Sequence, residues 1–238
     1  MINIMANKTN FEKVIDFNKC FGSIVSNNFN PSLFNTHPEI VTLKYSLINE
    51  EVNELLDAFY KNDTKEIIDA LSDIKYVLYG MAAAFGINMD TSFNKYFEYK
   101  LNYKNEDNYS DFKLVFNEYK TIFTIKEYLE NIKNKDYSGI CEENIIEIKN
   151  IDMNLNKYTQ EKDIKILELE LNKLLFYVNK CACLVGFDLD LSFDIVHNSN
   201  MTKVCDTEEL AQETVEWYIK NDDRYKSPSY RKNEYGYI

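Results

Sequence analysis

Apolar residues recur at helical spacing along most of this 238-residue chain, and alternating runs typical of half-buried strands are few. Clusters of Asn, Lys and Asp separate the periodic stretches, and Pro31, Pro38 and Pro228 fall outside them. The pattern predicts an all-α fold, a helical bundle of antiparallel hairpins. The predicted helices span residues 9–26, 39–61, 64–86, 89–103, 110–134, 140–150, 160–186, 189–203 and 207–221.

A repeat appears when the chain is shifted by one hundred positions. The sequence AFGINMDTSFN from Ala84 aligns with LVGFDLDLSFD from Leu184, and at both places a long apolar helix ends at a Gly. This predicts an internally duplicated pseudo-dimer, although two generic helix-end signals could also match by coincidence. We divide the single domain 1–238 into a catalytic helical repeat 39–105, a degenerate second repeat 110–205, and a C-terminal helix and tail 206–238.

Composition and charge narrow the class of protein. With 45% hydrophobic residues the chain can bury a core, and its net charge of −12 argues against nucleic acid as a partner. The longest apolar run, residues 76–87, is too short to cross a membrane, and the N-terminus lacks a signal-peptide pattern. Five Cys in apolar patterns suit reduced thiols, although Cys181 and Cys183 could also form a metal or redox site. We therefore expect a cytoplasmic protein.

Acidic residues lie where the apolar pattern requires buried side chains. On the helix predicted over 39–61, Glu51 falls inside the apolar arc, with Glu50 and Glu54 on its edge. On the next helix, a short turn away, the acids follow i, i+3, i+7 spacing in line with buried positions. These acids are Glu66, Asp69 and Asp73.

Burying several like charges is costly unless a cation neutralises them, and hard divalent cations prefer oxygen ligands. The two facing rows therefore predict an Mg²⁺ site. Two simpler interpretations remain open: Asp63 and Glu66 could form a capping box, and Glu50 and Glu54 could be ordinary solvated residues of an acidic chain.

Two longer motifs carry a family resemblance. EEVNELLDAF, followed by KEIIDALSDIKYVLYGMAAAFGI, resembles the all-α nucleoside triphosphate pyrophosphatases, the MazG-like and phosphoribosyl-ATP pyrophosphatase-like group. The E-x-x-E half of that signature matches Glu51 and Glu54, and the E-x-x-D half matches Glu66 and Asp69. A further motif, HNSNMTK at residues 197–203, is similar to the H-x-S-N-M-x-K pattern of one branch.

The resemblance implies that the carboxylates hold Mg²⁺, for which Mn²⁺ could substitute, and that water attacks the α-phosphorus of a triphosphate. Glu50 or Glu51 is the expected general base, and Asp73 an additional ligand. Asn200 and Lys203 are expected to contact phosphate or sugar. The locally basic tail, with Lys226 and Tyr230, could close over the nucleotide or could equally be a mobile terminus.

The chain departs from the family pattern in its order, because HNSNMTK follows the second repeat and not the first. One hundred residues after the acids stand Ile151, Asn154, Ile166, Leu169 and Lys173, so the second repeat lacks them. We expect one surviving active site in a monomeric pseudo-dimer or a homodimer. For His197, packing or hydrogen bonding is favoured over chemistry.

The leading hypothesis is an Mg²⁺-dependent pyrophosphohydrolase that converts a (deoxy)nucleoside triphosphate, dUTP or dCTP being favoured, to the monophosphate and pyrophosphate. Phosphoribosyl-ATP is the alternative substrate, and a non-catalytic nucleotide-binding scaffold is the alternative from another class. We expect a base pocket built from aromatic residues of the opposite repeat together with residues that precede Glu50: Phe34, Asn35, His37 and Tyr45.

Overall fold

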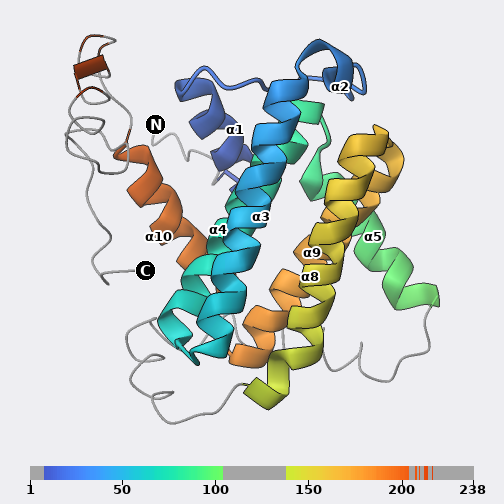
Figure 1. Ribbon diagram of the computed structural model, residues 1–238, viewed down its shortest axis with the longest axis vertical. Coiled ribbons are helices and arrows are strands. Elements are labelled where there is room, and N and C mark those ends of the chain that lie inside the picture. The colour runs from blue at the N-terminus through green and yellow to red at the C-terminus, as the bar shows by residue number, and fades with distance from the viewer. Residues whose placement is uncertain are drawn as a thin grey trace, which may run out of the picture.

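The computed structural model describes residues 8–103 and 138–203, together with positions 207, 209, 212, 213 and 216. Within this part of the chain every regular element is a helix, which confirms the all-α prediction (Figure 1). The helices are α1 (Asn10–Cys20), α2 (Leu33–Thr36), α3 (Pro38–Tyr60), α4 (Thr64–Phe85), α5 (Met89–Tyr103), α8 (Ser138–Glu161), α9 (Ile164–Val185) and α10 (Leu189–Met201).

Two helical hairpins, α3–α4 and α8–α9, turn by the same local mechanism. Asn62 and Lys162 adopt left-handed φ angles of 53° and 58° in the two turns. The next residues, Asp63 and Asp163, then cap α4 and α9 by accepting hydrogen bonds from the first free backbone N–H groups. Residues one hundred positions apart therefore build equivalent turns.

The second helix of each hairpin also ends in the same way. Gly86 and Gly186 follow α4 and α9 with φ angles of 69° and 90°, the left-handed conformation that glycine adopts without strain. At Gly86 a side chain is also excluded by contact, because a Cβ would lie 2.0 Å from the carbonyl oxygen of Asn28. The segment before α2 thus packs closely over the end of α4.

The four long helices form the centre of the molecule, with α3 packed on α8 and α4 packed on α9. The third helix of each half packs on the other half: α5 follows α4 in sequence but contacts α9, while α10 follows α9 and contacts α4. Figure 1 shows α10 and α5 on opposite sides of the four-helix core. This exchange is what brings the HNSNMTK motif to the first hairpin.

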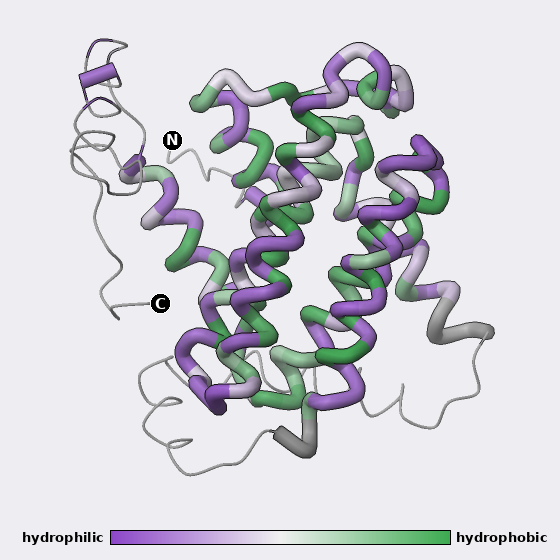
Figure 2. The backbone as a smooth tube through the Cα atoms, viewed as in Figure 1, coloured by the Kyte–Doolittle hydropathy of each residue, from purple (hydrophilic) through white to green (hydrophobic). Residues whose placement is uncertain are grey.

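Hydrophobic side chains from both hairpins merge into one core. Leu55, Ile74 and Met81 from the first hairpin and Leu155 and Leu174 from the second are all fully buried in it. Figure 2 shows hydrophobic and hydrophilic residues alternating along the long helices. None of the described helices is long and apolar enough to cross a membrane.

Two predicted helix limits were wrong. The first helix ends at Cys20 and not at residue 26, because Gly22 adopts a left-handed φ of 64°. The break predicted over 151–159 does not exist, since α8 continues through it with Ile151 and Leu155 buried one turn apart. The helix predicted over 110–134 lies outside the described residues, as does nearly all of 207–221.

Candidate active site

The α3–α4 hairpin carries all six predicted acids. Helix α3 supplies Glu50, Glu51 and Glu54, and α4 supplies Glu66, Asp69 and Asp73. Glu50 and Glu54 are exposed, whereas the other four are partly buried. The hairpin therefore holds a row of acids that runs from solvent toward the interior.

The acids lie close enough to affect one another's ionisation. Burial raises the pKa of Glu51 to about 9, and the charges of Asp73, Glu54, Glu50 and Asp69 raise it further in that order. Burial and then Asp73 likewise raise the pKa of Asp69 to about 8. The pKa of Asp73 rises to about 7, mainly through burial. Without a cation this cluster holds its negative charge at a cost.

Lys203 and Asn200 reach the acids from α10 and the turn that follows it. The charge of Lys203 lowers the pKa of both Asp69 and Asp73, and its ammonium group donates a 2.5 Å hydrogen bond to Oδ1 of Asn200. The structure therefore brings these two residues of the HNSNMTK motif to the acids of the other hairpin.

Tyr76 belongs to this site, although the sequence analysis did not single it out. It lies one helical turn after Asp73 on the same face of α4, and it is 5% exposed. Its hydroxyl lies 3.1 Å from Nδ1 of His197, and a hydrogen bond with Asn200 partly offsets the rise in the pKa of Tyr76 that burial causes. The i+3 spacing from Asp73 was the signal that could have identified it.

His197 packs against the aromatic ring of Tyr76. Its ring lies against that of Tyr76, with centroids 6.0 Å apart, and burial lowers its pKa below the usual value. A neutral imidazole that bonds to Tyr76 can fix the orientation of the tyrosine, and through it the position of Asn200.

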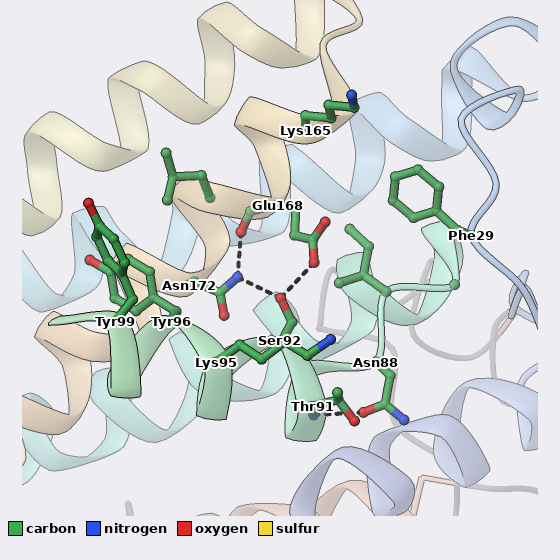
Figure 3. Close-up of a pocket in the computed structure, with 13 residues that line it drawn as sticks. Phe29, Asn88, Thr91, Ser92, Lys95, Tyr96, Tyr99, Lys165, Glu168 and Asn172 are labelled. Atoms are coloured by element: carbon green, nitrogen blue, oxygen red, sulfur yellow. Dashed lines mark hydrogen bonds between the residues drawn. The ribbon is translucent and has the colours of Figure 1, made fainter. Parts of the chain in front are cut away.

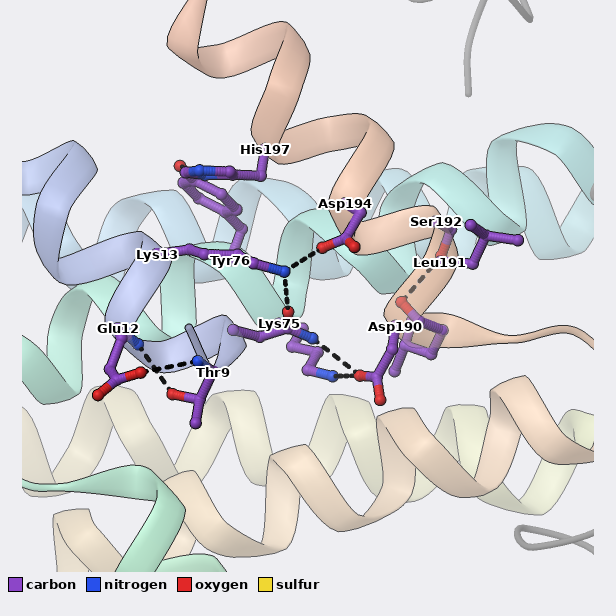
Figure 4. Close-up of polar contacts among 12 residues, drawn as sticks. Thr9, Glu12, Lys13, Lys75, Tyr76, Asp190, Leu191, Ser192, Asp194 and His197 are labelled. Atoms are coloured by element: carbon purple, nitrogen blue, oxygen red, sulfur yellow. Dashed lines mark hydrogen bonds and ion pairs between the residues drawn. The ribbon is translucent and has the colours of Figure 1, made fainter. Parts of the chain in front are cut away.

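Polar contacts fix α10 against α1 and α4 (Figure 4). Lys75, whose side chain is 5% exposed, forms a 2.6 Å ion pair with Asp190. The buried hydroxyls of Ser72 and Ser192 lie 2.6 Å apart, and Lys13 pairs with Asp194. These contacts hold the first half of α10 against α1 and α4, and the helix runs on from there toward Lys203. They do not belong to the acid cluster.

The donor set suits a hard divalent cation, because it consists of carboxylates whose mutual repulsion a cation would relieve. Among the residues that the structure describes, however, no three carboxylate, thiol or imidazole groups converge closely enough to form a ready metal site.

The residues predicted for a base pocket do not gather at the acids. Phe34 is buried against Phe85 at the far end of α4, about 18 Å along the helix from Asp73 at 1.5 Å per residue. Asn35 accepts a hydrogen bond from Lys162, and His37 contacts Thr36.

Tyr45, the fourth residue predicted for that pocket, lies near Asp152 of the second hairpin. Its burial, together with the charge of Asp152, raises the pKa of its hydroxyl to about 12. Lys226 and Tyr230 lie outside the described residues.

The first hairpin and its flanking helices match a known family. Residues 14–97 match the phosphoribosyl-ATP pyrophosphohydrolase family, a stretch that contains all six acids but not the second hairpin. An uncharacterized protein of Acanthamoeba polyphaga mimivirus is 39% identical over 211 residues, which cover 88% of this chain and 77% of that relative. No solved structure gave a significant match.

These matches agree with the geometry of the site. The acid pairs of the family signature face each other across one hairpin, and the matched region supports a nucleotide pyrophosphohydrolase kind of function. The chain belongs to the phosphoribosyl-ATP pyrophosphohydrolase family, within the MazG-like all-α nucleoside triphosphate pyrophosphatases.

Proposed function

We propose that this protein is an Mg²⁺-dependent pyrophosphohydrolase that cleaves a (deoxy)nucleoside triphosphate, dUTP or dCTP being favoured, to the monophosphate and pyrophosphate. The observation that carries the proposal is the cluster of acids around Glu51, whose pKa is raised by burial and by four neighbouring carboxylates. Natural chains retain such costly clusters mainly where function requires them.

Glu51, Glu54, Glu66, Asp69 and Asp73 would hold the cation. When bound, Mg²⁺ would neutralise charge on the phosphates and lower the pKa of the attacking water. Glu51 is surrounded by other acids, so we assign it to metal binding. Glu50 is exposed at the edge of the cluster, so we assign it to accepting the proton of the water.

The reaction balances with these residues. The water oxygen forms a bond to the α-phosphorus as the bond from that phosphorus to the bridging oxygen breaks, and pyrophosphate leaves with the electron pair. One water proton passes to Glu50. Lys203 and Asn200, held beside Asp73 by α10, would bind phosphate or sugar oxygens and keep the triphosphate aligned for attack by the water.

A second substrate has a specific observation in its favour. The family that matches residues 14–97 is named for phosphoribosyl-ATP, which contains the same kind of phosphoanhydride bond. The same acids could cleave it, so the substrate panel must include it.

The proposed duplication would explain why the second hairpin has no such cluster. Equivalent turns, caps and helix ends recur one hundred residues apart, and the second copy lacks acids at the matching positions. Under this proposal one of two ancestral sites survives, and the other half supplies Asn200 and Lys203.

The test is pyrophosphate release from a panel of ribo- and deoxynucleoside triphosphates plus phosphoribosyl-ATP, with Mg²⁺, Mn²⁺ or EDTA. Glu54→Gln should lose turnover, whereas the matched control Asp57→Asn, an exposed acid one turn farther along α3, should retain it. No release from any substrate would refute the enzymatic proposal and favour a nucleotide-binding scaffold.

A further inference from the structure

The HNSNMTK motif contains a polar residue that the proposed reaction does not use, His197. Its Nδ1 atom lies 3.1 Å from the hydroxyl of Tyr76, and the two rings lie side by side (Figure 4). Phe17 of α1 and Phe193 of α10 enclose the tyrosine ring, with ring centroids 5.4 and 5.3 Å from it. The hydroxyl of Tyr76 is therefore held between His197 and Asn200.

The hydrogen bonds that connect these side chains have fixed directions. The ammonium group of Lys203 can only donate, so Oδ1 of Asn200 accepts its 2.5 Å hydrogen bond. Burial raises the pKa of Tyr76, and the hydrogen bond with Asn200 lowers it. A donor to the phenolic oxygen has that effect, so the amide N–H of Asn200 donates. Tyr76 is then left with its own O–H to donate, and Nδ1 of His197 is placed to accept it.

His197 must be neutral to accept this hydrogen bond. A neutral imidazole with its proton on Nε2 offers Nδ1 as an acceptor, whereas an imidazolium carries protons on both nitrogens. Burial lowers the pKa of His197 more than any nearby charge does, and the hydroxyl of Tyr76 faces the ring from α4. The charged groups near the imidazole within the described residues, in decreasing order of effect, are Lys13, Asp194, Asp16 and Lys8. The lysines lower this pKa and the aspartates raise it.

The same contact between helices occurs in the other half of the molecule, where α5 packs on α9 as α10 packs on α4. The hydroxyls of Ser72 and Ser192 lie 2.6 Å apart in one contact. At the equivalent positions of the other, Asn172 donates a 2.8 Å hydrogen bond to Ser92 (Figure 3). Residues one hundred positions apart therefore face each other in the same register.

The ring pair of His197 and Tyr76 also has a counterpart, but an apolar one. Phe97 and Phe176 occupy the equivalent positions, and their ring centroids lie 6.4 Å apart, against 6.0 Å for His197 and Tyr76. Two phenyl rings fill this contact at the same spacing. The polar atoms of His197 and Tyr76 are therefore not a requirement of packing.

We propose that His197 and Tyr76 are positioning residues that hold the side chain of Asn200 in place for the substrate. A neutral imidazole at one end of the connected hydrogen bonds fixes the amide, and with it the partner of Lys203, at the other. This inference rests on the proposed function, in which Asn200 and Lys203 bind phosphate or sugar oxygens. Protonation of His197 would leave the O–H of Tyr76 without its acceptor and release Asn200, so nucleotide binding should weaken at acidic pH.

The first test observes the imidazole directly and needs no substrate. Long-range ¹H–¹⁵N NMR spectra of the full chain distinguish a proton on Nε2 from one on Nδ1, and because the chain has two histidines, His37→Asn assigns the signals. At pH 7.5 His197 should be neutral with its proton on Nε2, and it should become charged below the usual value of about 6.5. A proton on Nδ1, or an imidazolium at pH 7.5, would overturn the proposal.

The second test is nucleotide affinity, measured by titration calorimetry with Mg²⁺. The probes are α,β-imido-dUTP, α,β-imido-dCTP and α,β-methylene-ATP, whose bridges resist hydrolysis. Tyr76→Phe should weaken binding about fivefold, because it removes the oxygen that holds Asn200. The control is Tyr79→Phe, which removes the hydroxyl of another buried tyrosine of α4 whose ring also contacts Phe193. It should change the affinity less than about twofold.

A matched pair of variants at His197 separates positioning from packing. Asn and Leu side chains have nearly the same shape, but only Asn can accept a hydrogen bond from Tyr76. His197→Leu should weaken binding about fivefold at pH 7.5, whereas His197→Asn should retain it within about twofold. The ratio of the parent's affinity to that of His197→Asn should fall from pH 7.5 to 5.5, since Asn does not titrate. This ratio cancels the titration of the acids, which both proteins share.

Several results would overturn the proposal. These are parental affinity in Tyr76→Phe, equal losses in the two His197 variants, or an affinity ratio that does not change with pH. Failure of the proposed reaction gives a different result: a parent that binds the probes but releases no pyrophosphate, with losses confined to Tyr76→Phe and His197→Leu, would refute the reaction and support the positioning role. A parent that binds none of the probes would overturn both.

Discussion

The two hairpins have equivalent turns and helix caps, but their acidic side chains are arranged in opposite ways. In α3–α4 the acids cluster, and mutual repulsion adds to burial in raising the pKa values of Glu51 and Asp69. In α8–α9 the buried acids are separated, and each has a lysine three residues away. Lys149 pairs with Asp152 at 2.9 Å, and Lys173 pairs with Glu170 at 2.5 Å.

The paired network of the second hairpin uses residues at the positions of the missing acids. Asn154, which corresponds to Glu54, donates a 3.2 Å hydrogen bond to Glu170. Lys173, which corresponds to Asp73, neutralises the same carboxylate. The same hairpin can therefore be built with its buried acids apart and each paired with a lysine, so the clustering of acids in the first hairpin is not a requirement of the fold. This contrast favours function as the cause of the clustering.

The largest effect on activity should come from replacing an acid of the first hairpin by the residue at the equivalent position of the second. Asp69→Leu, which copies Leu169, should lower pyrophosphate release about 10²- to 10³-fold, because it removes a carboxylate that would hold the cation. Initial rates with Mg²⁺ measure the change, and circular dichroism checks folding. A folded variant with parental rates would show that Asp69 takes no part in catalysis.

Breaking the pairing in the second hairpin should cost stability without involving the acid cluster. In Lys173→Met, Glu170 keeps a charge on a side chain that is only 3% exposed, so the free energy of unfolding should fall by about 2 to 3 kcal/mol. Urea denaturation measures it. The control is Lys61→Met, whose pair with Asp57 is exposed on both sides and should contribute less than about 0.5 kcal/mol. Equal losses of unfolding free energy in the two variants would show that the buried pair stabilises the protein no more than the exposed one.

The first hairpin should make stability depend on pH when metal is absent. Its acids have raised pKa values in the folded state, so the folded protein binds more protons than the unfolded chain between pH 4 and the folded values of about 7 to 9. Stability should therefore fall as pH rises through that window, by about 1 to 3 kcal/mol after solvent screening is allowed for.

Thermal unfolding in EDTA from pH 5 to 8.5 measures this decline. Glu51→Gln should flatten the profile, because its amide stays neutral, whereas the exposed control Asp57→Asn should leave the profile parallel to the parent. Excess Mg²⁺ should restore stability at pH 8 in the parent. If the stability of the metal-free protein rose with pH instead, the acids would not be clustered as described.

The smallest effect concerns the contact between the two halves. Lys203→Met should raise KM for the triphosphate about tenfold with little change in stability, because one lysine–phosphate contact is lost. The control Lys19→Met removes an exposed lysine from α1 and should leave KM unchanged. An unchanged KM in both variants would remove Lys203 from the substrate site.

Much of the fold was predictable because local sequence fixes helices. Apolar periodicity located α3, α4, α5 and α10 to within two residues, and the glycines at 86 and 186 marked the ends of α4 and α9. The false break in α8 arose because polar residues dominate 150–160. Buried Ile151 and Leu155 sustain the helix there through tertiary packing, which a local pattern weighs poorly.

The site was predictable only in part. The acids could be identified from sequence because their i, i+3 and i+7 spacing places them on one helix face, and local geometry transmits that spacing directly. The sequence did not show that Phe34 lies far from the acids, because its burial against Phe85 depends on how the segment before α3 folds over the end of α4. No spacing rule contains that information.

By itself the sequence determined most of the long helices, the glycines that end α4 and α9, and the two acid rows of one hairpin, since these follow from interactions within a few residues. Only the tertiary structure decided that α10 packs on α4 and α5 on α9. That exchange placed Lys203 beside Asp73 and turned Asn172 toward Ser92, contacts that span 130 and 80 residues of sequence. Such contacts depend on which buried surfaces fit together, and helical periodicity leaves that choice open.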